Sequence, residues 1–114
     1  MNQNESIGFV ETIGLAAAIH AADVMVKSAN VTVEHVANAD SGLITVICKG
    51  DLASCNAAVD AAKAAVTRMG TCFNSHRIPR PSSDVDSLVN DHIGNMILPA
   101  KPARPVKKTT KTKK

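Results

Sequence analysis

The amino-acid sequence predicts an α+β fold in which four strands and two long helices follow the order β-α-β-β-α-β. Two alanine-rich stretches repeat apolar residues at helical spacing, and short runs rich in β-branched residues flank each of them. Glycine and polar clusters separate these segments. We therefore expect a four-stranded antiparallel sheet with both helices on one face, followed by a short C-terminal helix. The other face has no helix assigned to it and should meet solvent or a partner.

The first half of the chain predicts a strand, a helix and a strand pair. Residues 7–12 are a β-rich run that Gly14 ends. A helix follows, Asn30 is its expected terminator, and its apolar face consists of Leu15, Ala18, Ile19, Ala22, Val26 and Ala29. Residues 31–37 and 43–49 are predicted as strands that the turn at residues 38–42 joins.

The second half repeats the pattern. Asp51 is the expected N-cap of the second helix, and Gly70 fits the position after its end. The apolar face of this helix consists of Cys55, Ala58, Val59, Ala62, Val66 and Met69. Residues 71–78 are predicted as the fourth strand, which the prolines at 79 and 81 stop. Ser83 should cap a short helix over residues 84–90. We expect a flexible N-terminus over residues 1–6, one folded domain over residues 7–92 and a disordered Pro/Lys/Thr-rich basic tail over residues 93–114.

Composition and charge exclude several function classes. The chain has 114 residues, of which only two are aromatic, and this argues against an aromatic platform for stacking bases. Its net charge of +3 divides into a body of net charge −4 over residues 1–100 and a tail with seven Lys/Arg and no acid over residues 101–114. The body is therefore no basic nucleic-acid-binding surface. The tail either solubilises the protein or binds a polyanion through Lys107, Lys108, Lys111, Lys113 and Lys114.

The reactive side chains do not form a recognisable catalytic or metal motif. The candidate metal ligands, which lack ligand spacing, are Cys48, Cys55, Cys72, His20, His35, His76 and His92. Ser41 lies in a turn without a nucleophile elbow, and phosphate-binding glycine loops are absent. We expect no enzyme activity, no metal and no cofactor. The sequence also lacks a secretory signal and any apolar stretch long enough to span a membrane, so we expect a cytosolic protein with free thiols.

Three long segments resemble one family. They are IGFVETIGLAAAIHAADVMVKSANV, SGLITVICKGDLASCNAAVDAAKAA and HRIPRPSSDV. Together they are similar to the hexamer-forming shell proteins of bacterial microcompartments, which occur in carboxysomes and in propanediol- and ethanolamine-utilisation compartments. The resemblance covers about residues 6–89 and implies a ferredoxin-like β-α-β-β-α-β sandwich of the microcompartment-domain type.

The resemblance also implies a structural role. It implies a cyclic homohexamer that tiles edge to edge into a shell facet in the cytoplasm and provides a central pore for small metabolites. Lys27, Asn30 and Arg80 match the family's contacts between neighbouring hexamers, although local sequence alone favours ordinary solvated surface charges for Lys27 and Arg80. The implied partners are other copies, other shell proteins including pentameric vertices, and encapsulated enzymes. The alternative is a small α+β module that binds nucleic acid or another polyanion through its tail.

The pore loop departs from the family pattern. The matching residues are Asn38, Ala39, Asp40, Ser41 and Gly42, where the usual family pattern is K-I-G-S-G. Asn38 replaces a lysine and Asp40 replaces a glycine, so the resemblance combined with these replacements implies a more negative pore that repels anions. The tail has no counterpart in short family members. Because the family's termini lie on the concave face, six copies of the tail would be displayed together and could bind an acidic partner by multivalency.

Overall fold

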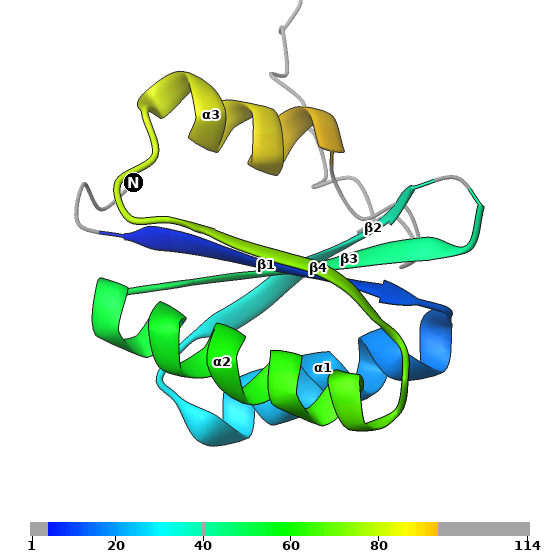
Figure 1. The fold of residues 1–114 in the computed structure, drawn as a ribbon. Coiled ribbons are helices and arrows are strands. Elements are labelled where there is room, and N and C mark those ends of the chain that lie inside the picture. The colour runs from blue at the N-terminus through cyan, green and yellow to red at the C-terminus, as the bar shows by residue number, and fades with distance from the viewer. Residues whose placement is uncertain (1–4, 40, 94–114) are drawn as a thin grey trace, which may run out of the picture.

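The computed structural model describes residues 5–39 and 41–93, and its elements follow the predicted order. The strands β1 (Ser6–Ile13), β2 (Thr32–Ala39), β3 (Leu43–Gly50) and β4 (Cys72–Ile78) form one antiparallel sheet in the order β2-β3-β1-β4. The helices α1 (Leu15–Ser28) and α2 (Leu52–Arg68) cover one face of this sheet (Figure 1). The predicted α+β class is thus confirmed. No helix of the described residues is long and apolar enough to cross a membrane.

The C-terminal helical segment lies on the opposite face of the sheet. It consists of α3 (Ser83–Ser87) and the π-helical stretch η1 (Leu88–Ile93), which continue as one coil (Figure 1). The expectation of a face without a helix is therefore wrong. The reason lies in the short connection after β4, whose prolines stop the strand and let the chain cross over the sheet edge to this side.

Local signals set the ends of the helices. The Asp51 side chain accepts a hydrogen bond from the backbone N–H of Ser54 at 2.8 Å, which confirms the predicted cap of α2. Gly70 has a φ of 72°, the left-handed conformation that commonly ends a helix. The expected cap of the third helix is wrong by one residue, because Ser82 caps it and Ser83 is its first helical residue.

The main core lies between the sheet and the two long helices, and small residues bring these layers close together. Buried alanines line both helices, among them Ala21 of α1 and Ala58 of α2. Gly8 of β1 marks the closest approach, because a Cβ atom there would lie 2.5 Å from Cγ2 of Val59 and 2.9 Å from Sγ of Cys48. A side chain at this position would therefore force the buried Val59 and Cys48 side chains to shift, so close packing here favours glycine.

The buried face of α1 overlaps only in part with the predicted one, because Ala18 is buried and Ala22 and Ala29 pack against the core, but the three larger predicted residues do not. Its buried residues are Ala17, Ala18, Ala21 and Met25. Three larger residues of the predicted face, Leu15, Ile19 and Val26, are 47%, 55% and 48% exposed. The helix is apolar on two sides, and the side that meets the sheet consists of three alanines and Met25. Met69, predicted on the buried face of α2, is also exposed, because it follows the last helical residue as the C-cap.

Candidate functional site

The sheet has two distinct ends. Strands β1 and β3 pair from Ser6↔Gly50 at one end to Ile13↔Leu43 at the other. The β2–β3 turn, which immediately precedes Leu43, projects beyond the helices at the second end (Figure 1). We call the end at Leu43 the turn end and the end at Gly50 the rim end.

The turn end holds the predicted pore residues. Ser41 and Gly42 have φ values of 70° and 80°, the left-handed conformation that a tight turn between these strands needs. The Gly14 N–H donates a hydrogen bond to the Gly42 carbonyl at 2.9 Å, which ties the turn to the start of α1. Asn38, Ser41 and Gly42 are exposed. Asp40 lies outside the described residues.

The rim end holds the three predicted edge residues, which lie far apart in the sequence. Lys27 is in the last turn of α1 and Asn30 follows this helix directly. Arg80 directly follows Pro79. The Pro79 carbonyl accepts a hydrogen bond at 2.6 Å from Oγ of Ser6, which is the first residue of β1. All three side chains are exposed, and the structure gives no hydrogen bond or ion pair that joins them to one another. They share one end of the molecule and remain available to a neighbouring molecule.

Lys27 forms only a weak, exposed ion pair within its own chain. Its Nζ lies 2.9 Å from Oδ2 of Asp23, one helical turn earlier, and the two side chains are 72% and 49% exposed. An exposed pair of this kind contributes about 0.3–0.5 kcal/mol. A partner with a better-placed acceptor could therefore take the Lys27 ammonium at little cost.

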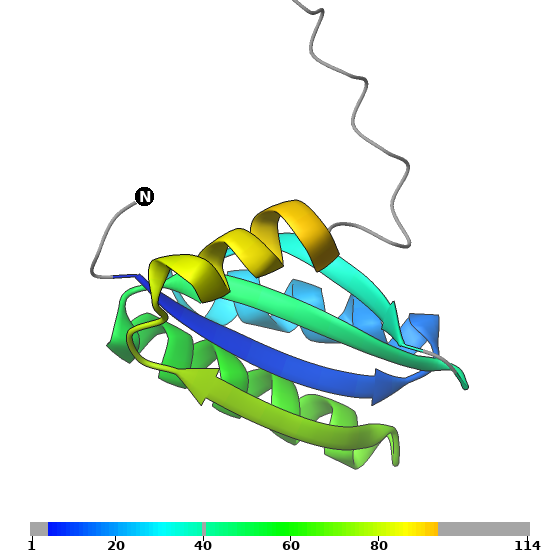
Figure 2. The ribbon, with the colours of Figure 1, turned by 90° about the horizontal axis from the view of Figure 1, so that it is seen from above.

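The two lateral edges of the molecule carry different surfaces: one is a stripe of apolar side chains, and the other is a mostly polar hollow beside an exposed aromatic ring. Helix α1 lies beneath the β2 side of the sheet and α2 beneath the β4 side (Figure 2). The outer side of α1 presents Leu15, Ile19 and Val26, which we call the α1 stripe. On the opposite edge, Phe73 is 58% exposed. It borders a hollow of about 470 Å³ between the end of α2 and β4, which we call the β4 hollow.

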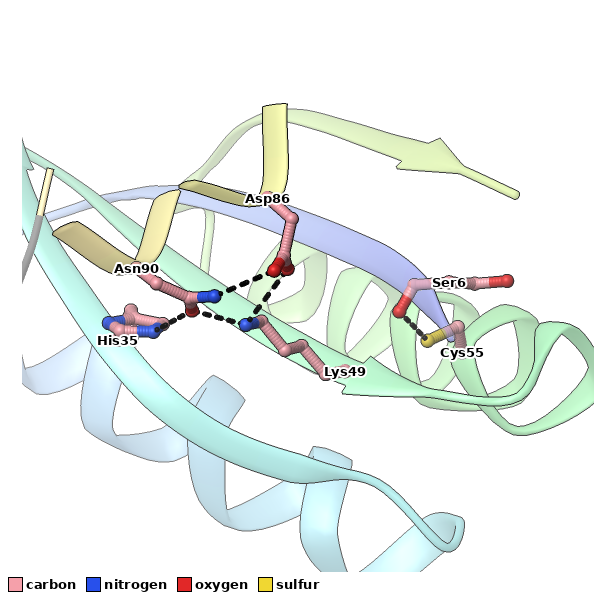
Figure 3. A network of polar contacts seen from close by, with 6 residues as sticks. All are labelled: Ser6, His35, Lys49, Cys55, Asp86 and Asn90. Atoms are coloured by element: carbon pink, nitrogen blue, oxygen red, sulfur yellow. Dashed lines mark hydrogen bonds and ion pairs between the residues drawn. The ribbon is translucent and has the colours of Figure 1, made fainter. Parts of the chain in front are cut away.

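A buried polar network that the sequence did not predict joins the sheet to the C-terminal segment (Figure 3). Lys49 Nζ of β3 lies 3.4 Å from Asp86 Oδ1 of α3, and the two side chains are 8% and 10% exposed. Lys49 also donates to Oδ1 of Asn90, and Nδ2 of Asn90 donates to Asp86 Oδ2 at 3.0 Å. His35 of β2 contacts the same Asn90 oxygen through Nε2 at 3.1 Å. Removing one partner of such a buried pair costs roughly 3–5 kcal/mol, because the other charge stays buried alone.

Comparisons with known proteins agree on one family. The BMC domain model matches residues 6–81. The chain is 49% identical over 87 residues to the bacterial microcompartment shell protein PduA of Citrobacter freundii, an alignment that covers 76% of this chain and 94% of PduA. It is 44% identical over 84 residues to the bacterial microcompartment shell protein EutM of Escherichia coli, covering 74% of this chain and 87% of EutM.

A solved structure supports the same fold. The crystal structure of a microcompartment protein from Desulfitobacterium hafniense superimposes with a TM-score of 0.66 at 29% sequence identity. The match covers 75% of this chain and 46% of that chain, so this chain spans less than half the length of that relative.

The cysteines of the described residues are free thiols that pack in the fold. Cys48 of β3 and Cys55 of α2 are fully buried in the main core, and Cys55 Sγ donates to the Ser6 carbonyl at 3.3 Å. Burial, reinforced by the neighbouring Cys55 thiol, raises the pKa of Cys48 to about 12. Burial raises the pKa of Cys55 as well. No cluster of three metal-ligating side chains occurs within the described ranges.

The raised pKa of Cys48 predicts a loss of stability in alkali. Between pH 9 and pH 12 the unfolded chain releases the Cys48 proton while the folded chain keeps it, so the free energy of unfolding falls as the pH rises. One such group contributes a slope of about 1.4 kcal/mol per pH unit. Urea unfolding at pH 7, 9 and 10.5 should therefore show a smaller alkaline loss in Cys48→Ala than in the unmodified protein. Below pH 9 the two curves should run parallel, and parallel curves up to pH 10.5 would contradict the prediction.

Proposed function

The chain belongs to the BMC domain family of bacterial microcompartment shell proteins, and from this premise we propose that it is a structural tile. Six copies close into a flat ring, and rings join edge to edge in a shell facet. The tile performs no catalysis; it encloses the compartment and admits small metabolites through the centre of each ring. Its place is the microcompartment shell within the cytoplasm.

The observation that carries this proposal is the presence of two unlike surfaces with exposed apolar side chains on opposite lateral edges. The α1 stripe lies on the β2 side, whereas Phe73 and the β4 hollow lie on the β4 side. A contact between unlike surfaces is heterologous, so repeating it produces a closed ring or an open filament rather than a simple dimer. We propose that the α1 stripe of one copy packs against the β4 hollow of the next. The number six comes from the family.

The turn end supplies the pore in this arrangement. Asn38, Ser41 and Gly42 are exposed at the tip of the protein, away from the packed body. In a ring with the turn ends at the centre, each of these positions is repeated six times around the axis. Asp40 in the same turn would add a ring of carboxylates, which repels anions and favours neutral or cationic metabolites.

The rim end supplies the contact between rings. Because the strands run from the turn end to the rim end, a ring with its turns at the centre has Lys27, Asn30 and Arg80 at its circumference. The weak pairing of Lys27 with Asp23 leaves its ammonium available to a neighbouring ring. The Arg80 guanidinium can donate bidentate hydrogen bonds to carboxylates or carbonyls across the same boundary. The same edge would bind other shell proteins, including the pentamers at vertices, and the assembled shell would enclose enzymes.

The basic tail is proposed as an additional binding segment rather than as the main function. Its lysines lie outside the described residues. Residues 1–100 carry a net charge of −4, so the folded body gives a polyanion no attractive surface. Six tails on one ring could nevertheless bind an acidic partner strongly through multivalency, even when a single tail binds it weakly.

Removing the rim cations should separate ring formation from tiling. In Lys27→Ala/Arg80→Ala we expect rings of normal size in light scattering and no extended sheets in electron microscopy, because neither side chain belongs to the α1 stripe or lines the β4 hollow. Arg68→Ala is the matched control, since Arg68 is an exposed cation at the C-terminal end of α2, which lies toward the turn end and away from the rim end. Sheets formed by the double variant as readily as by the control would refute the rim assignment.

Removing the turn carboxylate should increase anion passage. Asp40→Asn takes one negative charge from each subunit at the pore, and we expect the permeability of assembled shells to a small anionic dye to rise about tenfold. Glu34→Gln is the control, because Glu34 is an exposed acid in the part of β2 distant from the turn. If dye entry is the same in both variants, Asp40 does not control the pore.

A further inference from the structure

The C-terminal segment is attached to the sheet at few points. We call residues 83–93, which form α3 and η1, the cover; it lies across the sheet on the face opposite α1 and α2 (Figure 2). Among residues 83–91, whose side chains are described, only Asp86 and Val89 are buried. The cover thus buries one charged and one apolar side chain, one helical turn apart.

The apolar attachment closes a small second core. Val89 packs with Ile7 of β1 and Ile47 of β3, and these three side chains are 2%, 1% and 2% exposed. Phe9 packs against the edge of this cluster. This cluster is separate from the main core, which lies on the opposite face of the sheet. Ile7 and Ile47 consequently depend on the cover for their burial.

The polar attachment is a closed cycle of three side chains. Lys49 of the sheet donates to both Asp86 and Asn90 of the cover, and Asn90 donates to the other oxygen of Asp86 (Figure 3). His35 of β2 adds a hydrogen bond to Asn90 from the neighbouring strand. Since the Asn90 oxygen only accepts, His35 donates through Nε2, and its buried Nδ1 has no partner among the described residues.

From these contacts we propose that the cover is a two-position element and that Lys49, Asp86 and Asn90 form its latch. In the docked position every charge of the latch is satisfied. A partly open position would leave Lys49 or Asp86 buried without its counter-ion, which is the costliest arrangement. The cover therefore opens as a unit, releasing the latch to water and exposing Ile7 and Ile47 together. The connection at residues 79–82, outside both helix and strand, is the hinge.

Opening of the cover would also affect the segment that follows it. Residues 94–114 follow the cover in the sequence, and docking fixes the backbone of Ile93, the last described residue, on the sheet face opposite the two long helices. Opening the latch would release it from that face and present an apolar surface in its place. The proposal concerns a single chain and holds whether or not the chain forms rings.

Hydrogen exchange measured by mass spectrometry on the full chain tests the latch. We expect Asp86→Asn, which leaves Lys49 without a counter-ion, to speed amide exchange in residues 83–91 at least tenfold. The double variant Lys49→Met/Asp86→Leu replaces the ion pair by apolar side chains of similar size. It should keep the cover docked, with exchange close to that of the unmodified protein, because no unpaired charge remains.

Two controls make the outcome decisive. Asp84→Asn removes an exposed acid of the same helix, two residues from Asp86, and should leave exchange unchanged. Peptides from α2 should exchange at the same rate in every variant, which shows that the body stays folded. Equal exchange in Asp86→Asn and Asp84→Asn would overturn the latch. Faster exchange in α2 of Asp86→Asn would overturn the idea that the cover moves separately from the body.

Discussion

The close approach of the two alanine-rich helices to the sheet is the constraint on which the rest of the structure depends. A layer this thin has room for Ala17, Ala21 and Ala58, and at Gly8 it has no room for any side chain. Small side chains bury little area each, so the single chain gains less from its core than a chain with larger residues would. Helix α1 turns its alanines and Met25 toward the sheet, so Leu15, Ile19 and Val26 stay outside, where they form a surface that another copy can bury.

The two faces of the sheet serve different purposes. The face that α1 and α2 cover forms a continuous apolar core with these helices, in which even the thiols of Cys48 and Cys55 act as packing groups. The other face has one small apolar cluster and one ion pair, both made with the C-terminal segment. A buried ion pair contributes little net stability because desolvation offsets its attraction, but it allows few alternative arrangements. One face thus supplies stability, whereas the other sets the position of a single segment.

The sequence predicted what depends on short-range signals and missed what depends on distant contacts. The Asp51 cap and the helix end at Gly70 involve neighbouring residues, and both were predictable. The buried face of α1 was not, because a helix with apolar residues on two sides does not indicate which side meets its own sheet. The ion pair between Lys49 and Asp86 joins residues 37 positions apart. Neither residue lies in a motif, and no local pattern could have paired them. The turn and rim residues were proposed from family resemblance; the structure adds that these two sets lie at opposite ends of one sheet.

These features support our proposal that identical neighbours in a closed ring complete the burial that a single chain lacks. Native mass spectrometry of the full chain tests it most directly. The account predicts a dominant species of six times the 11.9 kDa chain mass, without an open series of larger and smaller oligomers. A dominant 11.9 kDa monomer at micromolar concentration would contradict it, because the α1 stripe and the β4 hollow would then lie exposed without a partner.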